Sequence, residues 1–350
     1  EKGLLDANFE ITPYVNVFNR PPDSGFSQFM DHPRYSTGYA TLWNTLGMMV
    51  ETHMLKPYKY RVEGTYGLMK EMVEIIEVDH KKIKSLRAKA NALAMNSEKF
   101  LLNWTLDTTK TNPFDFKGFK ADTILSEITG MPRLKYDREQ PFEKEIPYQN
   151  EYYPQDTITI PEAYIIKKGW KKVMDRLAAN QIEFYELEED TLLTVEGYRI
   201  ASYETYSKSY EGHYPHYGTK VSVSKMSISF DKGDYVIPTK QPGIRYILET
   251  LEPEAVDSFF NWNFFDTVLQ QKEGFSPYVF EDLALTILEE NPALRDSLER
   301  KKQKDETFAQ NWYGQLDWIY NNSQYKEPAH LQYPVYRILT ESDTISVLKN

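Results

Sequence analysis

The sequence predicts a mixed α/β fold, with an α/β N-terminal part, a β-rich region and then a helical C-terminal section. Three patterns carry this prediction. Apolar residues recur at three- and four-residue steps over 57–95, which is typical of an amphipathic helix. Apolar and polar residues alternate over 192–237, as they do in half-buried strands. Helical spacing returns from residue 245 onward.

The first predicted strand is short and apolar. Residues 46–50, Leu-Gly-Met-Met-Val, form an uninterrupted apolar run that ends at the polar sequence Glu51-Thr52-His53. Such a run favours a buried, central strand. Pro57 then opens a long helix that we expect to end near Met95 and to flank the strand.

Further along the chain, aromatic residues alternate with charged ones over 101–160 and prolines recur, which predicts short antiparallel strands. Residues 162–187 predict a βαβ-like unit, with a strand at 163–166, a helix at 170–180 and a second strand at 182–185.

These patterns divide the chain into three parts. We predict an N-terminal domain over 1–100, a β-rich accessory domain over 101–245 that includes the βαβ-like unit, and a helical section over 246–350 that packs on the preceding parts.

Composition and charge exclude several classes of protein. The net charge of −11 has both signs interspersed, whereas a nucleic-acid surface needs clustered Lys and Arg. No apolar run reaches about 18 residues, so no transmembrane helix is predicted. The absence of cysteine excludes disulfides, thiolate metal sites and cysteine nucleophiles. No signal peptide is visible, and the first residues, EKGLLDANFEITPYV, read as a chain entered partway through.

Glu51 is the first candidate for chemistry. In α/β sheets, functional groups lie just beyond the carboxyl ends of strands, which is the position predicted for Glu51. A partly buried carboxylate there would have a raised pKa and could act as a general base. The alternative, favoured by the residues alone, is an exposed glutamate that caps the following turn. His53 is interpreted as a packing or orienting residue.

Residues 34–62 resemble the C-terminal part of the catalytic domain of zinc carboxypeptidases of the carboxypeptidase A/B type, the funnelin family, in a bacterial branch. The segment PRYSTGYATLWNTLGMMVETHMLKPYKYRVEGTY carries the resemblance. Three downstream segments resemble the C-terminal extension of that branch: YEGHY, QPGIRYILETLEPEAVDSFFNWNFFD and YVFEDLA, with looser similarity over 100–160. The likeness covers most of residues 30–335 and implies a partial carboxypeptidase-like sheet in 1–100.

The resemblance implies that Glu51, in MMVETH, is the general base that takes a proton from a zinc-bound water. It implies that Tyr35, in RYSTGYA, closes over the substrate, with Tyr39 as a competitor for that role. Arg34, Tyr39 and His53 are the implied substrate-binding candidates. The implied cofactor is Zn²⁺, the substrate is a peptide, and the location is periplasmic or extracellular.

The sequence also departs from the family pattern. None of the six histidines begins the HxxE motif that supplies two zinc ligands in the family. We therefore expect the zinc ligands upstream of residue 1, no metal ligands within this chain and no tight zinc site. The pair His213-x-x-His216 favours a structured loop over a metal site. The aromatic stretch 261–265 favours a helix buried against another domain over a stacking platform for sugars or peptides.

Two further functions stay open beside the zinc carboxypeptidase: a non-catalytic module that binds peptide or cell-wall material, and a pseudoenzyme. The reading as part of a larger enzyme makes one structural prediction. Met48, Met49, Met69 and Val73 should form an exposed apolar patch, through which the chain dimerises or binds an N-terminal half.

Overall fold

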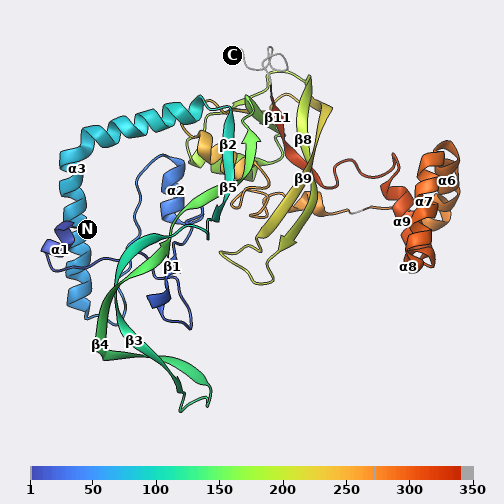
Figure 1. Ribbon diagram of the computed structural model, residues 1–350. Coiled ribbons are helices and arrows are strands. Elements are labelled where there is room, and N and C mark those ends of the chain that lie inside the picture. Colours follow the sequence, from blue (N-terminus) through green and yellow to red (C-terminus); the bar gives the residue numbers. More distant parts are fainter. Residues whose placement is uncertain (1, 272, 340–350) are drawn as a thin grey trace. The chain divides into compact units, whose positions relative to one another are not determined.

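The computed structural model describes residues 2–271 and 273–339 and confirms the mixed α/β class (Figure 1). The chain forms two compact units, each made of segments that are distant in sequence. Unit 1 contains the residues up to 162, with 176–183 and 237–258. Unit 2 contains 163–175, 184–236 and the residues from 259 onward. The three-part division at residues 100 and 245 concerns continuous segments and stays a prediction.

Unit 1 contains the long helix α3, which spans Tyr58–Met95 and so agrees with the predicted helix to within one residue. The short helix α1, Lys2–Asp6, packs on it. The Phe9 ring lies against Gly64 and Gly67, where an added Cβ would come within 3.2 and 3.5 Å of its atoms. Two glycines in the first turns of a helix thus make room for an aromatic ring.

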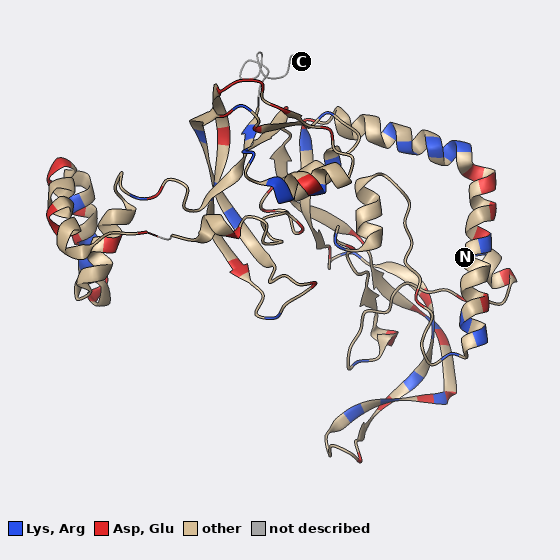
Figure 2. Cartoon of the chain, turned by 180° about the vertical axis from the view of Figure 1, so that it is seen from behind, with Lys and Arg blue, Asp and Glu red and all other residues tan. Residues whose placement is uncertain are grey.

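The charges of α3 are sorted along its length. Figure 2 shows acidic residues in its middle and basic residues toward its C-terminal end. The acidic residues are Glu71, Glu74, Glu77 and Asp79, and the basic ones are Lys81, Lys82, Lys84, Arg87 and Lys89. Of the residues of α3, all of which the structure describes, only Leu68 is buried.

The strands of residues 101–160 in unit 1 pair antiparallel, as predicted, although two are much longer than expected. One sheet pairs β2, Lys99–Leu106, with β5, Tyr152–Thr159. The other pairs β3, Asn112–Leu125, with β4, Pro132–Gln149, and adds the two-residue β1, Phe26–Ser27, parallel to β4. The remaining elements of unit 1 are the 3₁₀ turn η1, Pro22–Ser24, and the helices α2, Ser36–Leu42, and α5, Ile244–Leu251.

Unit 2 contains a six-stranded sheet in the order β7-β10-β6-β11-β8-β9. The predicted strand at 163–166 is confirmed residue for residue as β6, all four of whose side chains are buried. The long hairpin β8–β9 confirms the alternation predicted over 192–237. The bounds of the strands are Ala163–Ile166 for β6, Tyr185–Glu186 for β7, Thr191–Thr205 for β8, His216–Phe230 for β9, Tyr235–Pro238 for β10 and Gln332–Ile338 for β11.

Helix α4, Lys171–Ala179, follows β6 and agrees with the predicted helix at 170–180. The second strand of the predicted βαβ-like unit begins later than expected, since β7 starts at Tyr185. In the sheet, β10 lies between β6 and β7, so the two strands joined by α4 are not neighbours.

The C-terminal helices share an apolar core around Phe280, Leu298 and Ile319. Asn291, Asp305 and Asn311 cap three of them, each accepting a hydrogen bond from a backbone N–H three residues later. The helices are α6, Pro277–Glu290; α7, Pro292–Lys304; α8, Glu306–Ala309; and α9, Trp312–Asn321. They confirm the predicted helical section.

Three sequence expectations are wrong. Residues 46–50 form no strand, and Met48, Met49 and Val50 are exposed, because no neighbouring strand pairs with them. Residues 252–265 form successive turns and the 3₁₀ turn η2, Asp266–Leu269, follows, so the helix predicted at 261–265 is absent. The C-terminal section also returns to the sheet as β11, despite Pro334, and the β11–β8 register is irregular between Gln332 and Tyr336.

Candidate functional site

Arg34 lies two residues before α2 and is held by one carboxylate, that of Asp257, in unit 1. Its backbone N–H donates to Oδ2 of Asp257 at 2.8 Å, and its Nε donates to Oδ1 at 2.8 Å. Its Nη2 lies 2.8 Å from the same Oδ1. The Asp257 side chain is only 4% exposed and that of Arg34 is 18% exposed. In this partly buried ion pair, two guanidinium nitrogens thus share one carboxylate oxygen, and the backbone N–H of Arg34 binds the other.

A second carboxylate, that of Glu249 on α5, lies close to the same pair. Burial raises the pKa of Glu249 from 4.5 to about 7, Arg245 one turn earlier opposes the rise, and Asp257 adds to it. Burial also lowers the pKa of His32, an effect opposed by Asp257 and reinforced by Arg34. Unit 1 thus contains a carboxyl group that exchanges its proton near neutral pH, which is the property required of a general acid or base.

The two candidate tyrosines lie at the start and in the middle of α2. Tyr35 precedes the first residue of the helix. The Tyr39 hydroxyl donates to Oδ1 of Asn180 at 2.6 Å, and the Asn180 amide donates to the Tyr246 hydroxyl at 2.9 Å. Trp43 stacks on the Tyr246 ring, with ring centroids 5.9 Å apart. Tyr39 is therefore part of a hydrogen-bonded and aromatic contact between α2, residue 180 and α5.

Glu51 and His53 lie in the irregular segment that follows α2. Both side chains are exposed. Nδ1 of His53 accepts a hydrogen bond from the backbone N–H of Leu55 at 3.2 Å, which closes a local turn. Within residues 2–271 and 273–339, Glu51 makes no hydrogen bond or ion pair. The predicted strand that would place Glu51 at the edge of a sheet is absent, so Glu51 is not a partly buried carboxylate in this arrangement.

The structure therefore divides the predicted site residues into two groups. Arg34, Tyr35 and Tyr39 lie together on α2 and the residues just before it, and the contacts of Arg34 and Tyr39 are made with other parts of unit 1. Glu51 and His53 lie in water on the segment that follows. The roles assigned to all five residues stay predictions.

The histidine pair His213 and His216 lies in unit 2, and its two rings serve different contacts. His216 is buried between Oγ1 of Thr205, 2.8 Å from Nδ1, and Oδ1 of Asp266, 3.0 Å from Nε2. The His213 ring packs edge-on against Trp262, with centroids 5.4 Å apart. The surroundings of the two rings are thus those of a structured turn, as the sequence favoured.

The described residues do not fit a zinc ion. No group of three or more His, Cys, Asp or Glu side chains that could hold a metal occurs among them. The carboxylates nearest to the candidate residues, Asp257 and Glu249, lie beside two arginines. We therefore derive no catalytic step through a metal.

Comparison with protein-family models, with curated proteins and with solved structures finds no match for this chain. No helix within the described residues has the length and apolar character needed to cross a membrane.

Sequence reasoning missed Asp257 and Glu249. A signal for Glu249 was present, because it is an acidic residue between Leu248 and Leu251 in a helix whose other residues are mostly buried. An ionisable group on an apolar helix face indicates either a partner or a shifted pKa. For Asp257 the sequence held no comparable signal.

Proposed function

We propose that this chain is the part of a secreted zinc carboxypeptidase that supplies its catalytic carboxylate, Glu51. The metal ligands are then provided by residues outside these 350, and the protein removes C-terminal residues from peptides in the periplasm or outside the cell. The observation that supports the proposal is the exposed apolar surface on both sides of the Glu51 segment.

Part of that surface is residues 46–50. Met48 is 59% exposed and Met49 is 52% exposed, although such a run is typical of a buried strand. Its backbone groups have no strand to pair with, and each large apolar side chain left in water forgoes about 1.5–3 kcal/mol. A segment of this composition is expected to add to a sheet supplied by a partner.

The other part is one face of α3. Val62, Tyr66, Met69, Val73 and Ile76 follow one another at alternating steps of four and three, so they share one face, and all five are exposed. Phe9 and α1 pack near residues 64–71 on the opposite side. The prediction that Met48, Met49, Met69 and Val73 are exposed is confirmed, and it is this surface that a further half of the enzyme would cover.

The test uses the protein expressed together with its upstream coding region. Peptide hydrolysis and bound zinc are measured for the wild type, for Glu51→Gln and for the control Glu98→Gln, which alters another exposed glutamate. We expect Glu51→Gln to lower kcat by at least about a hundredfold while zinc stays bound, because a general base contributes about 10²–10⁴ in rate. Full activity in Glu51→Gln would remove the assignment of Glu51.

A matched experiment addresses the exposed surface. Met49→Asp and Val73→Asp place a charge on it, and Ile128→Asp places one on the exposed tip of the β3–β4 hairpin. We expect the first two variants to weaken binding between this chain and a separately expressed upstream half and Ile128→Asp to leave it unchanged. Equal binding by all three variants would favour the non-catalytic module.

A further inference from the structure

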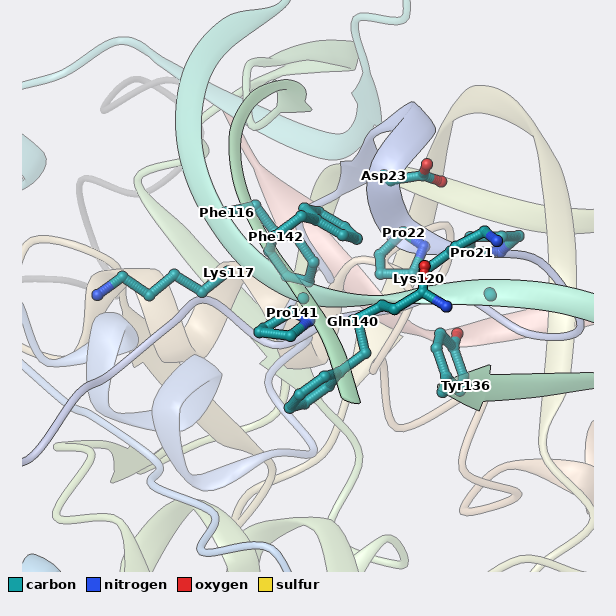
Figure 3. A pocket seen from close by; sticks show the side chains of 13 residues that line it. Pro21, Pro22, Asp23, Phe116, Lys117, Lys120, Tyr136, Gln140, Pro141 and Phe142 are labelled. Carbon is teal, nitrogen blue, oxygen red and sulfur yellow. The ribbon is translucent and has the colours of Figure 1, made fainter. Parts of the chain in front are cut away.

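An open cavity of about 590 Å³ lies beside the β3–β4 hairpin in unit 1 (Figure 3). Three segments line it: the turn Pro21–Asp23, residues 116–121 of β3, and Tyr136 with residues 140–142 of β4. The volume is within the range of small-ligand sites, which is about 300–1,000 Å³. Nothing in the carboxypeptidase proposal uses this cavity.

The cavity exists because the hairpin is irregular at this point. Phe119 pairs with Pro141, but the next residue of β3, Lys120, pairs with Asp137. Residues 138–140 of β4 therefore have no opposite residue on β3 and form a bulge. The Asp137 carboxylate accepts hydrogen bonds from the Glu139 backbone N–H at 3.0 Å and from the Gln140 side chain at 2.7 Å. A bulge held in this way turns side chains out of the regular alternation.

Below this lining, two aromatic rings pack directly on the backbone of Gly118. A Cβ added to Gly118 would come within 2.8 Å of both the Phe116 and the Phe142 rings. The two rings, whose centroids are 6.3 Å apart, thus pack over the position that a side chain at residue 118 would occupy. Figure 3 shows them together beside the Pro21–Asp23 turn.

The lining is aromatic, with cations at its margin. Phe119 and Tyr136 are each more than two-fifths exposed, although aromatic side chains are usually covered. Lys117 is held by Glu10 at 2.6 Å. Lys120 lies 3.7 Å from Asp122, and both side chains are more than half exposed, so this ion pair is weak and its ammonium group can turn to another anion.

We propose that this cavity binds a peptide by an aromatic side chain, with a neighbouring carboxylate of the peptide at Lys120. The ring is received at the exposed aromatic side chains of the lining, Phe119 and Tyr136, where ring–ring contact adds to the burial of apolar surface. A sugar needs several free hydrogen-bonding groups, whereas the Gln140 amide and the Asp137 carboxylate already bind each other. The inference is independent of the proposed peptidase activity.

The experiment is a fluorine NMR titration of the whole 350-residue chain with acetyl-alanyl-para-fluorophenylalanine. The probe is compared with its C-terminal amide, which has the same shape without the charge. We expect saturable shifts for both, with the free acid binding about two- to fivefold more tightly, as an exposed ion pair provides.

Variants assign the two contacts. Lys120→Met should remove the preference for the acid while leaving binding of the amide unchanged. Tyr136→Ala should weaken both probes by about tenfold or more. The control Tyr153→Ala removes a comparably exposed aromatic ring on β5, outside the cavity, and should change neither probe. Thermal unfolding of each variant verifies that its fold is retained.

Three outcomes would overturn the proposal: no saturable shift at probe concentrations of about 10 mM, equal binding by wild type and Tyr136→Ala, or equal binding of acid and amide to the wild type. Gly118→Val provides an independent check, because its side chain would displace the Phe116 and Phe142 rings that support the lining. Undiminished binding by a folded Gly118→Val would also contradict the assigned position. Competition of the probe by chitobiose at a lower concentration than by the unlabelled peptide would assign the cavity to a sugar.

Discussion

Two short apolar runs in this chain differ in structure: one is a buried strand and the other is an exposed, irregular segment. Ala163-Tyr164-Ile165-Ile166 is strand β6, and all four residues are 0% exposed. Leu46-Gly47-Met48-Met49-Val50 is irregular, and its four larger side chains are 43–81% exposed. Both runs are apolar, but they differ in their neighbouring strands. The first run, β6, lies between β10 and β11, whereas the second belongs to no sheet.

The difference teaches that an apolar run becomes a strand only where other strands receive it. Backbone N–H and C=O groups must be paired before a segment is buried, and a strand obtains those pairs from its neighbours. Residues 46–50 keep their backbone groups in water together with their side chains. The same segment would lower its free energy by joining a sheet edge, which is why we interpret it as part of an interface.

The largest expected effect on stability comes from breaking the Arg34–Asp257 ion pair, which anchors the segment before residues 46–50. Asp257→Ala leaves the Arg34 guanidinium partly buried without its carboxylate. We expect the free energy of unfolding to fall by about 3–5 kcal/mol, as is usual when one partner of a buried pair is removed. Urea unfolding followed by tryptophan fluorescence measures it.

The control for that change is Arg20→Ala. Arg20 is exposed and reaches only the Ser24 hydroxyl, at 3.4 Å, so its loss should alter the free energy of unfolding by less than about 0.5 kcal/mol. A similar loss in both variants would show that the N-terminal segment is held by its general contacts, and the special place given to Asp257 would be wrong.

A somewhat smaller effect is expected from pH. The folded-state pKa of Glu249, about 7, is above its ordinary value of 4.5. The folded state therefore retains a proton that the unfolded state has released, so the stabilisation is complete below about pH 4.5 and is lost as the pH rises through 7. A shift of this size corresponds to about 3 kcal/mol.

Glu249→Gln isolates this contribution, because it removes the titration and keeps a side chain of the same shape. His32, whose pKa is lowered, has the opposite dependence: stability rises with pH as its unfolded-state imidazole loses its proton. The wild-type curve minus the Glu249→Gln curve should therefore fall with pH across 4.5–7. Parallel curves would mean that Glu249 ionises normally.

The smallest expected effect comes from the same substitution, isoleucine to valine, made once in a buried strand and once on an exposed helix face. Ile165→Val in β6 deletes a buried methylene and should cost about 0.5–1.5 kcal/mol. Ile76→Val on α3, where the side chain is exposed, should change the free energy of unfolding by less than about 0.5 kcal/mol. An equal cost at both positions would mean that the α3 face is covered in solution, and analytical ultracentrifugation would then identify a dimer.

Sequence reasoning succeeded where the signal is local and repeated. The α3 pattern extends over ten turns and begins after Pro57, so the predicted and observed bounds differ by one residue. The alternation over 192–237 and the run at 163–166 were likewise sufficient for β6, β8 and β9, because these segments pair with one another or with β11 inside one sheet.

Prediction from the sequence failed where the structure of a segment depends on residues that are distant in the chain. Nothing within 46–50 reveals whether a neighbouring strand is present. The apolar spacing of 245–265 continues past Pro253, but Asn263 has a φ of +64°, which a helix does not accommodate. Strand β11 was missed because Pro334 weakens a strand pattern.

For the candidate site, the sequence identified Arg34 through its position in a resembling segment, but Asp257 is 223 residues further along the chain. The pKa of Glu249 arises from enclosure by unit 1, which no window of sequence contains. Local sequence patterns thus identified Arg34. They identified neither Asp257, its partner in the ion pair, nor Glu249, the carboxyl group close to that pair.

Helix α3 has one further consequence, for the order of events when a partner binds. At 38 residues it is far longer than the roughly 12–15 at which isolated helices become marginal. Lys59 and Lys70 each lie one turn before a glutamate, at 3.7 and 3.6 Å, and the last third is rich in Ala, Leu and Lys. Such a helix can form from its own sequence before anything covers its apolar face. A partner of the kind proposed above would meet a preformed ridge and lose no affinity to ordering it, so its association would be fast and limited by encounter.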